Sequence, residues 1–100
     1  MAVNKYVLSA TARTDMKAIA KYTIEKLGET QSLKYAEGLK KILANLAENP
    51  KLGRSYVAVK NKMLFRFRYK AHVIFYYETP NEIFIVRVLG GKMDFPKHLK

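Results

Sequence analysis

The chain has 100 residues, a formal net charge of +11 and no cysteine, which excludes disulfide bonds, zinc sites with thiolate ligands and thiol catalysis. This length allows one domain with a single modest core, and a 49% share of hydrophobic residues is typical of a folded chain rather than a disordered one. We find neither a secretory signal segment nor a run of transmembrane length, so we expect a cytoplasmic protein.

The positive charge is concentrated in the second half of the sequence. Residues 51–100 carry eleven Lys or Arg and three Asp or Glu, against eight and five in residues 1–50, and residues 51–77 contain no acidic residue. A field of this sign attracts polyanions or acidic proteins and accelerates the encounter with them. We therefore expect a partner of opposite charge. The alternative is that the basic surface serves only solubility.

The first half of the chain predicts a short strand followed by two helices. Residues 6–9 favour a strand. Apolar residues at helical spacing predict a first helix over residues 12–27 with Thr11 as its N-cap. A second helix, over about residues 31–48, has Thr30 as its expected N-cap. Because only two or three residues join the helices, they should form an antiparallel hairpin.

From residue 63 onward the hydrophobic period changes to two, which predicts three strands. We assign the aromatic and valine positions to the helix-covered face of the sheet: Phe65, Phe67, Tyr69, Val73, Phe75, Tyr77, Phe84, Val86 and Val88. The opposite, open face then collects cationic and polar residues on an isoleucine floor: Arg66, Arg68, His72, Tyr76, Arg87, Ile74, Ile83 and Ile85. Such a mixed face indicates a binding surface, although a solvated face with isolated isoleucines is the alternative. The predicted fold class is α+β, in the order β-α-α-β-β-β, with the helix hairpin on one face of a mainly antiparallel sheet.

Several residues have structural alternatives to a functional role. Asp15 can interact with the dipole of the first helix, and Arg54, in a turn, can anchor the fold through an ion pair. Arg87, alone among apolar residues, is expected on the open face, with an ion pair to Asp94 or to the C-terminus as the alternative. The tail after Gly90 either contacts a target or covers the end of the sheet.

Five segments in this order resemble the ParE toxins of type II toxin–antitoxin modules, which belong to the RelE/ParE superfamily. They are residues 8–23, 28–31, 46–54, 72–76 and 87–94. No segment is specific alone, but their order and spacing together are, and the resemblance extends from about Lys5 to Asp94. The family's fold is also the one that the periodicity predicts.

The resemblance implies one ParE-like toxin domain over residues 1–100, with a flexible tail at about 95–100. It implies that the chain inhibits DNA gyrase, through the A subunit, by binding and without catalysis, cofactor or metal. An acidic, partly disordered ParD-type antitoxin should neutralise it in a higher-order complex. The target-binding candidates lie on the open face and near the C-terminus: Arg66, Arg68, Arg87, Lys92, Met93 and Asp94. The antitoxin-binding candidates are apolar or aromatic positions on the second helix and the sheet: Tyr35, Ile42, Leu46, Phe65, Ile74 and Tyr76.

One position departs from the family pattern, and one alternative function stays open. Gly90 stands where the family usually has a histidine before the Met-Asp pair, so either toxicity is attenuated or the C-terminal turn is looser. The alternative is a RelE-like ribosome-dependent mRNA endonuclease, in which His72 or Tyr76 would move protons, but no carboxylate accompanies either residue. A nucleic-acid binder without catalysis is the third class.

Overall fold

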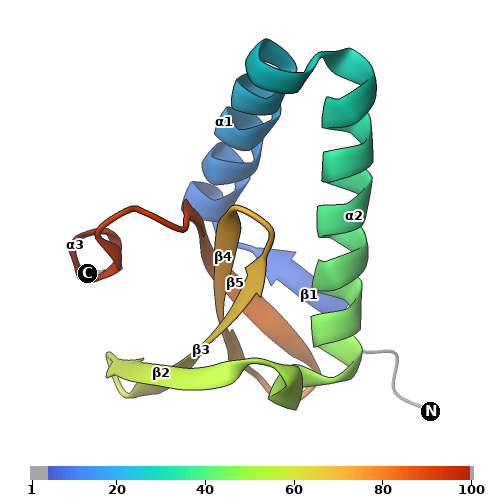
Figure 1. The fold of residues 1–100 in the computed structure, drawn as a ribbon. Helices are drawn as coiled ribbons and strands as arrows, with labels where there is room; N and C mark the ends of the chain where they lie inside the picture. The colour runs from blue at the N-terminus through green and yellow to red at the C-terminus, as the bar shows by residue number, and fades with distance from the viewer. Residues whose placement is uncertain (1–4, 100) are drawn as a thin grey trace.

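The computed structural model describes residues 5–99, in which a helix hairpin covers one face of a five-stranded sheet (Figure 1). The elements are β1 (Lys5–Leu8), α1 (Ala10–Leu27), α2 (Glu29–Glu48), the 3₁₀ turn η1 (Pro50–Leu52), β2 (Arg54–Val59), β3 (Lys62–Tyr69), β4 (His72–Glu78), β5 (Glu82–Gly90) and α3 (Phe95–His98). The strand order is β1-β5-β4-β3-β2, with β1 parallel to β5 and the other pairs antiparallel. The predicted fold class is confirmed, with β2 as one strand more than expected. Within residues 5–99 no helix has both the length and the apolar character needed to cross a membrane.

The predicted N-caps of both long helices, Thr11 and Thr30, are each wrong by two residues. Ser9 caps α1, because its Oγ accepts a hydrogen bond from the Ala12 amide at 2.9 Å and also donates to the Val86 carbonyl at 2.7 Å. The cap is thus fixed by β5 as well as by the helix. The second helix begins directly after Gly28, whose φ of 85° permits the sharp change of direction, and it has no side-chain cap.

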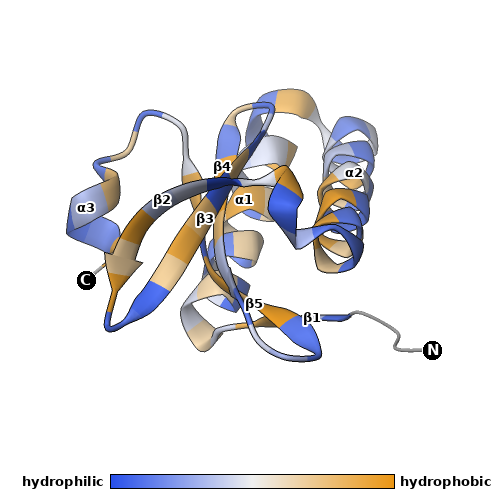
Figure 2. Cartoon of the chain, turned by 90° about the horizontal axis from the view of Figure 1, so that it is seen from below, coloured by the Kyte–Doolittle hydropathy of each residue, from blue (hydrophilic) through white to orange (hydrophobic). Residues whose placement is uncertain are grey.

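The helix-covered face of the sheet holds the larger of two cores. In Figure 2 the apolar residues of α2 lie on the side toward the strands and the hydrophilic residues on the outer side. The buried members of this core are Ala12, Ile19, Tyr35, Leu39, Leu43, Leu46, Ala47, Ile74, Tyr76, Ile83, Ile85 and Val88. Its position explains why the predicted helix periodicity is correct for α2, although Leu33 near the start of this helix is exposed.

The face prediction is correct for β3 and wrong for β4. A two-residue turn joins these strands, so that Tyr69 lies directly opposite His72. Residues opposite each other in an antiparallel pair share a face. His72, Ile74 and Tyr76 therefore face the helices together with the aromatic residues of β3, whereas Val73 and Phe75 face away.

In β5 a bulge changes the alternation. The pairing with β4 shifts at Val86, so that Ile83, Ile85 and Val88 all belong to the helix-side core. The predicted isoleucine floor of the open face is therefore wrong, because Ile74, Ile83 and Ile85 are fully buried under the helices.

The second face of the sheet has a core of its own, which the C-terminal segment helps to build. Its buried members are Leu64, Val73, Phe75, Leu89 and Leu99. Tyr56, Val59, Tyr77, Val86 and Phe95 pack around them. The last residues, for which we expected a flexible tail, form α3 beside this core, and Leu99 is only 6% exposed. These contacts favour the alternative in which the tail covers the sheet.

Candidate functional site

The hairpin of β2 and β3 positions three arginines on one side of the sheet. Its turn consists of Lys60 and Asn61, both with positive φ (51° and 67°), as a two-residue hairpin turn of type I′ requires. The register of β2 and β3 shifts by one residue between Ser55 and Ala58, and this shift places Arg54 directly opposite Arg66. Arg68 follows two residues after Arg66 on the same face. The face that carries Arg54 is thus set by this register shift together with the turn.

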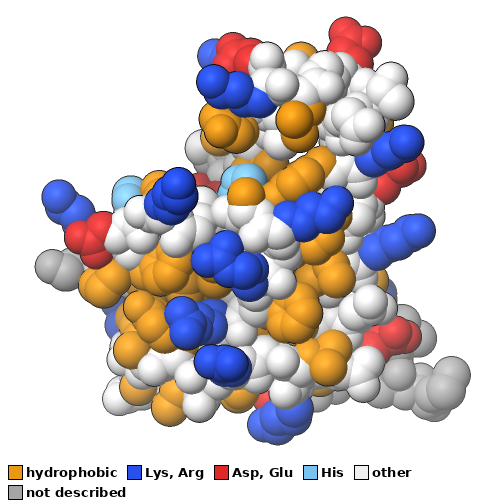
Figure 3. Space-filling view, viewed as in Figure 1, with side chains coloured by type: hydrophobic (Ala, Val, Ile, Leu, Met, Phe, Trp, Pro, Cys, Tyr) orange, Lys and Arg blue, Asp and Glu red, His pale blue; other side chains and the backbone are white. Residues whose placement is uncertain are grey.

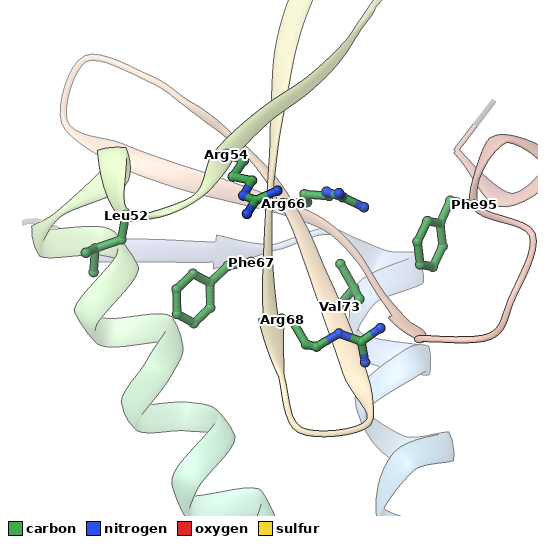
Figure 4. Close-up of a pocket in the computed structure, with 7 residues that line it drawn as sticks. All are labelled: Leu52, Arg54, Arg66, Phe67, Arg68, Val73 and Phe95. Atoms are coloured by element: carbon green, nitrogen blue, oxygen red, sulfur yellow. The ribbon is translucent and has the colours of Figure 1, made fainter.

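Arg54, Arg66 and Arg68 line a hollow of about 450 Å³, which we call the arginine pocket (Figure 4). Apolar and aromatic residues complete its lining: Leu52, Phe67, Val73 and Phe95. Among residues 5–99 the ion pairs are Lys51–Glu78 and Arg87–Asp15, so none of the three pocket arginines is neutralised by a carboxylate there.

Local contacts orient two of the pocket arginines. The Arg66 guanidinium carbon lies 5.4 Å from the centroid of the Tyr56 ring, and Arg68 Nη1 donates to the Lys70 carbonyl at 3.1 Å. In Figure 3 Lys and Arg side chains run down the middle of the visible face, with hydrophobic side chains between them, while Asp and Glu lie at its margins. The arginine pocket can bind an anion, but its lining contains no group that gains or loses a proton near neutral pH.

Arg87, by contrast, is engaged in a partly buried ion pair. Its Nε and Nη2 donate to the two carboxylate oxygens of Asp15 at 2.8 and 2.9 Å, and its Nη1 donates to the His98 carbonyl at 3.0 Å. The two side chains are only 18% and 11% exposed, and the hydrogen bond with Asp15 raises the pKa of Arg87 above its ordinary value. The predicted pairing of Arg87 with Asp94 is therefore wrong, and the predicted alternative, the C-terminus, lies outside the described residues. Asp15 is also not in the first turn of α1, so the dipole explanation fails for it.

The other three target-binding candidates lie in the loop between β5 and α3. Lys92, Met93 and Asp94 are all exposed. Lys92 and Met93 line a second cavity of about 680 Å³, between α1 and the ends of β4 and β5, and Arg68 lines this cavity as well as the arginine pocket. The structure thus connects the loop with the arginines through Arg68.

Most antitoxin-binding candidates are core residues. Leu46, Ile74 and Tyr76 are fully buried, and Tyr35 is 9% exposed, so these four are unavailable to a partner on the folded chain. The Tyr76 hydroxyl donates to the Pro50 carbonyl at 2.7 Å and accepts from the Gly53 amide at 3.0 Å, and burial raises its pKa. The accessible candidates are Ile42 and Phe65, which are partly buried.

Comparison with known proteins identifies the family. The family model described as the ParE toxin of the type II toxin–antitoxin system parDE matches residues 6–95. The chain belongs to the ParE toxin family. It is therefore a toxin of the kind found in type II toxin–antitoxin systems.

A solved structure has the same fold as this ParE-family chain. It comes from the chromosomal ParDE system of P. aeruginosa, with a TM-score of 0.70 and 16% sequence identity over 88% of this chain and 96% of the other. Among the curated proteins compared with the chain, none matches significantly. The structural likeness at this identity concerns the fold alone.

The backbone conformation at residue 90 does not require a glycine. The φ of Gly90 is not positive, and a Cβ there would meet only the Met93 side chain, at 3.6 Å, an ordinary contact distance. The end of β5 therefore accepts a Cβ at this position, where the resemblance leads us to expect a histidine side chain. Gly90 leaves the second cavity, which it lines, free of that side chain.

Arg54 is the arginine of the arginine pocket that the sequence analysis does not place among the candidates. We interpreted it as a turn residue and ion-pair anchor, yet no carboxylate pairs with it in the described part of the chain. The signal for it is the apolar run Tyr56–Val59, rich in β-prone residues, directly before the Lys60-Asn61 turn, which is typical of a strand. Regular pairing of that strand with β3 would place Arg54 opposite Phe67, and only the register shift between Ser55 and Ala58 places it opposite Arg66.

The stability of the fold should depend on pH through His72. Its Nδ1 shares a hydrogen bond of 2.6 Å with the Tyr35 hydroxyl, and burial lowers the pKa of His72 from 6.5, so the folded state disfavours the protonated ring. Since the unfolded chain takes up a proton at His72 first, stability is full above about pH 6.5 and declines as the pH falls through that value. We expect the melting temperature to fall between pH 7.5 and 5.5, and to fall less in a His72→Gln variant. Parallel pH profiles for the two proteins would contradict this role of His72.

Proposed function

We propose that this ParE-family toxin inhibits DNA gyrase in the cytoplasm by binding its A subunit, and that it catalyses no reaction. The family match over residues 6–95 carries the proposal. We further propose that an acidic, partly disordered ParD-type antitoxin neutralises the toxin in a higher-order complex.

The chemistry of the surface supports binding rather than RNA cleavage. Cleavage needs groups that take and give protons beside the cations that stabilise the phosphorane. His72 and Tyr76, which the ribonuclease alternative would use, are both buried and are hydrogen-bonded to Tyr35 and to η1 respectively. No observation therefore favours the endonuclease.

We propose that the accessible candidates form the target-binding surface: Arg66, Arg68, Lys92, Met93 and Asp94. Arg68 supports this grouping, since it lines both the arginine pocket and the cavity beside the loop. The engagement of Arg87 with Asp15 supports a structural role for Arg87 instead.

Gyrase assays beside a translation assay test the proposed activity. The purified toxin should inhibit supercoiling by a bacterial DNA gyrase and leave a cell-free translation extract active. Arg66→Ala/Arg68→Ala should weaken inhibition about tenfold or more, because residues that anchor an interface each contribute about 1–2 kcal/mol or more. The matched control is Lys34→Ala/Lys40→Ala, which removes two exposed cations from α2. Arrested translation with unaffected gyrase would instead establish the endonuclease.

Antitoxin binding should be strongly dependent on ionic strength. The toxin carries a net charge of +11, and opposite charges steer association at rates that fall as salt screens them. We expect the association rate with the cognate antitoxin to fall about tenfold or more between 50 and 300 mM salt in stopped-flow measurements. Arg66→Gln/Arg68→Gln should reduce the slope of that dependence. An association rate that does not change with salt would refute electrostatic steering.

A further inference from the structure

We propose that the arginine pocket is a binding site for the phosphodiester groups of a nucleic-acid strand. This inference does not rest on the proposed function, because the chain alone would bind DNA or RNA through Arg54, Arg66 and Arg68. The observation behind it is that three arginines line one hollow and belong to residues 51–77, which contain no acidic residue.

The arrangement has an electrostatic cost that a bound anion would offset. Like charges directly opposite each other in an antiparallel pair are destabilising, and Arg54 lies directly opposite Arg66. Arg68 adds a third charge on the same face, and no carboxylate among residues 5–99 pairs with any of them. An anion between these groups would form charge-assisted hydrogen bonds with several guanidiniums at once.

The extent of the positive charge favours a polyanion over a single carboxylate. Residues 51–77 contain seven Lys or Arg and no Asp or Glu, and most of them lie on the β2–β3 hairpin. A nucleic-acid strand offers a phosphate at every nucleotide and can neutralise such a row of charges, whereas one acidic side chain neutralises only one. Arg66 stacked on Tyr56, and Phe95 in the pocket lining, add aromatic surface beside the cations.

Fluorescence anisotropy with a labelled 20-nucleotide single-stranded DNA tests the site without gyrase. The test variant is Arg54→Gln/Arg66→Gln/Arg68→Gln. The control is Lys34→Gln/Lys40→Gln/Lys41→Gln, which removes the same charge from exposed positions on α2. We expect the arginine variant to bind about tenfold or more weakly at 50 mM salt, and its log–log salt slope to fall by about 2, since each neutralised phosphate of a single strand contributes about 0.7. The control should change binding much less.

Further variants separate specific phosphate binding from an effect of net charge or of unfolding. Arg→Lys at the three positions keeps the charge and removes the bidentate geometry, so it should bind with intermediate affinity. Melting temperatures should not fall in the glutamine variant, because like-charge repulsion is relieved. If that variant does unfold, Arg54→Gln alone, an exposed residue on the edge strand, should still weaken DNA binding measurably.

Two results would overturn the site. The first is equal weakening in the lysine control and in the arginine variants, which would mean that DNA responds only to net charge. The second is unchanged DNA binding in the arginine variants while a labelled Glu-rich peptide loses affinity, which would make the pocket a site for an acidic protein segment. Because gyrase is absent from these assays, either result leaves the proposed gyrase inhibition to its own test.

Discussion

Arg87→Ala is expected to lower the free energy of unfolding by about 2–4 kcal/mol, because it leaves the carboxylate of Asp15 partly buried without its counter-charge. For a domain of this size the melting temperature should fall by roughly 10–20 °C. Thermal unfolding followed by circular dichroism measures the change. The loss of a surface cation would have almost no effect on such a melting curve.

The size of the effect follows from where the ion pair sits. The bulge at Val86 interrupts the regular pairing between β4 and β5, and two side chains of α1 and its cap bind backbone groups of β5 beside it. Ser9 Oγ donates to the Val86 carbonyl, and Asp15 accepts from the Val88 amide at 2.9 Å. Arg87 holds Asp15 in that position and also reaches the His98 carbonyl. One arginine thus joins α1, β5 and α3.

A second variant separates charge from packing. Arg87→Met/Asp15→Asn removes both charges and keeps an oxygen that can accept from the Val88 amide. It should recover a substantial part of the stability lost in Arg87→Ala, since removing both partners of a buried pair costs less than removing one. If Arg87→Ala melts like the parent chain yet no longer inhibits gyrase, Arg87 belongs to the target-binding surface after all.

The sequence correctly predicts features that depend on local patterns, such as helix and strand periodicity. It does not predict features that depend on a contact between distant residues or on the register between strands. Hydrophobic periods of 3.6 and 2 residues are sufficient to predict α2 and the side of the sheet to which the aromatic residues of β3 point. The face of β4 was also predictable in principle, because a two-residue turn after Tyr69 forces His72 onto the same face. Our assignment followed the rule that aromatic residues belong to the helix side, and missed that this protein has apolar cores on both faces of the sheet.

The candidate site was predictable in part for the same reason. Arg66 and Arg68 follow from alternation within one strand, and Arg54 required the pairing of β2 with β3. The partner of Arg87 could not be deduced, since Asp15 is 72 residues away and meets it only through the docking of α1 at the bulge in β5. The cap at Ser9 likewise depends on a contact with Val86, 77 residues away.

Truncation of the chain after Asp94 is expected to lower the melting temperature by roughly 20 °C or more, or to prevent folding. Truncation removes Phe95 and Leu99 from the second core, where deletion of a buried leucine or phenylalanine side chain typically costs about 2–5 kcal/mol each. It also removes the His98 carbonyl that Arg87 binds. Since a domain of this size has a total stability of only about 5–15 kcal/mol, these losses together approach its limit.

Point variants assign the effect to packing. The Phe95 ring lies 5.0 Å from the ring of Phe75 in a T-shaped arrangement, and Leu99 is nearly fully buried, so Phe95→Ala and Leu99→Ala should each lower the melting temperature by roughly 10 °C or more. Lys97→Ala, at an exposed position of the same helix, is the control and should have no measurable effect. If the truncated chain melts at the same temperature as the parent, the flexible tail predicted from the sequence is correct after all. In that case any loss of gyrase inhibition after truncation would reflect a direct contact, whereas a destabilised truncated chain loses activity because less of it is folded.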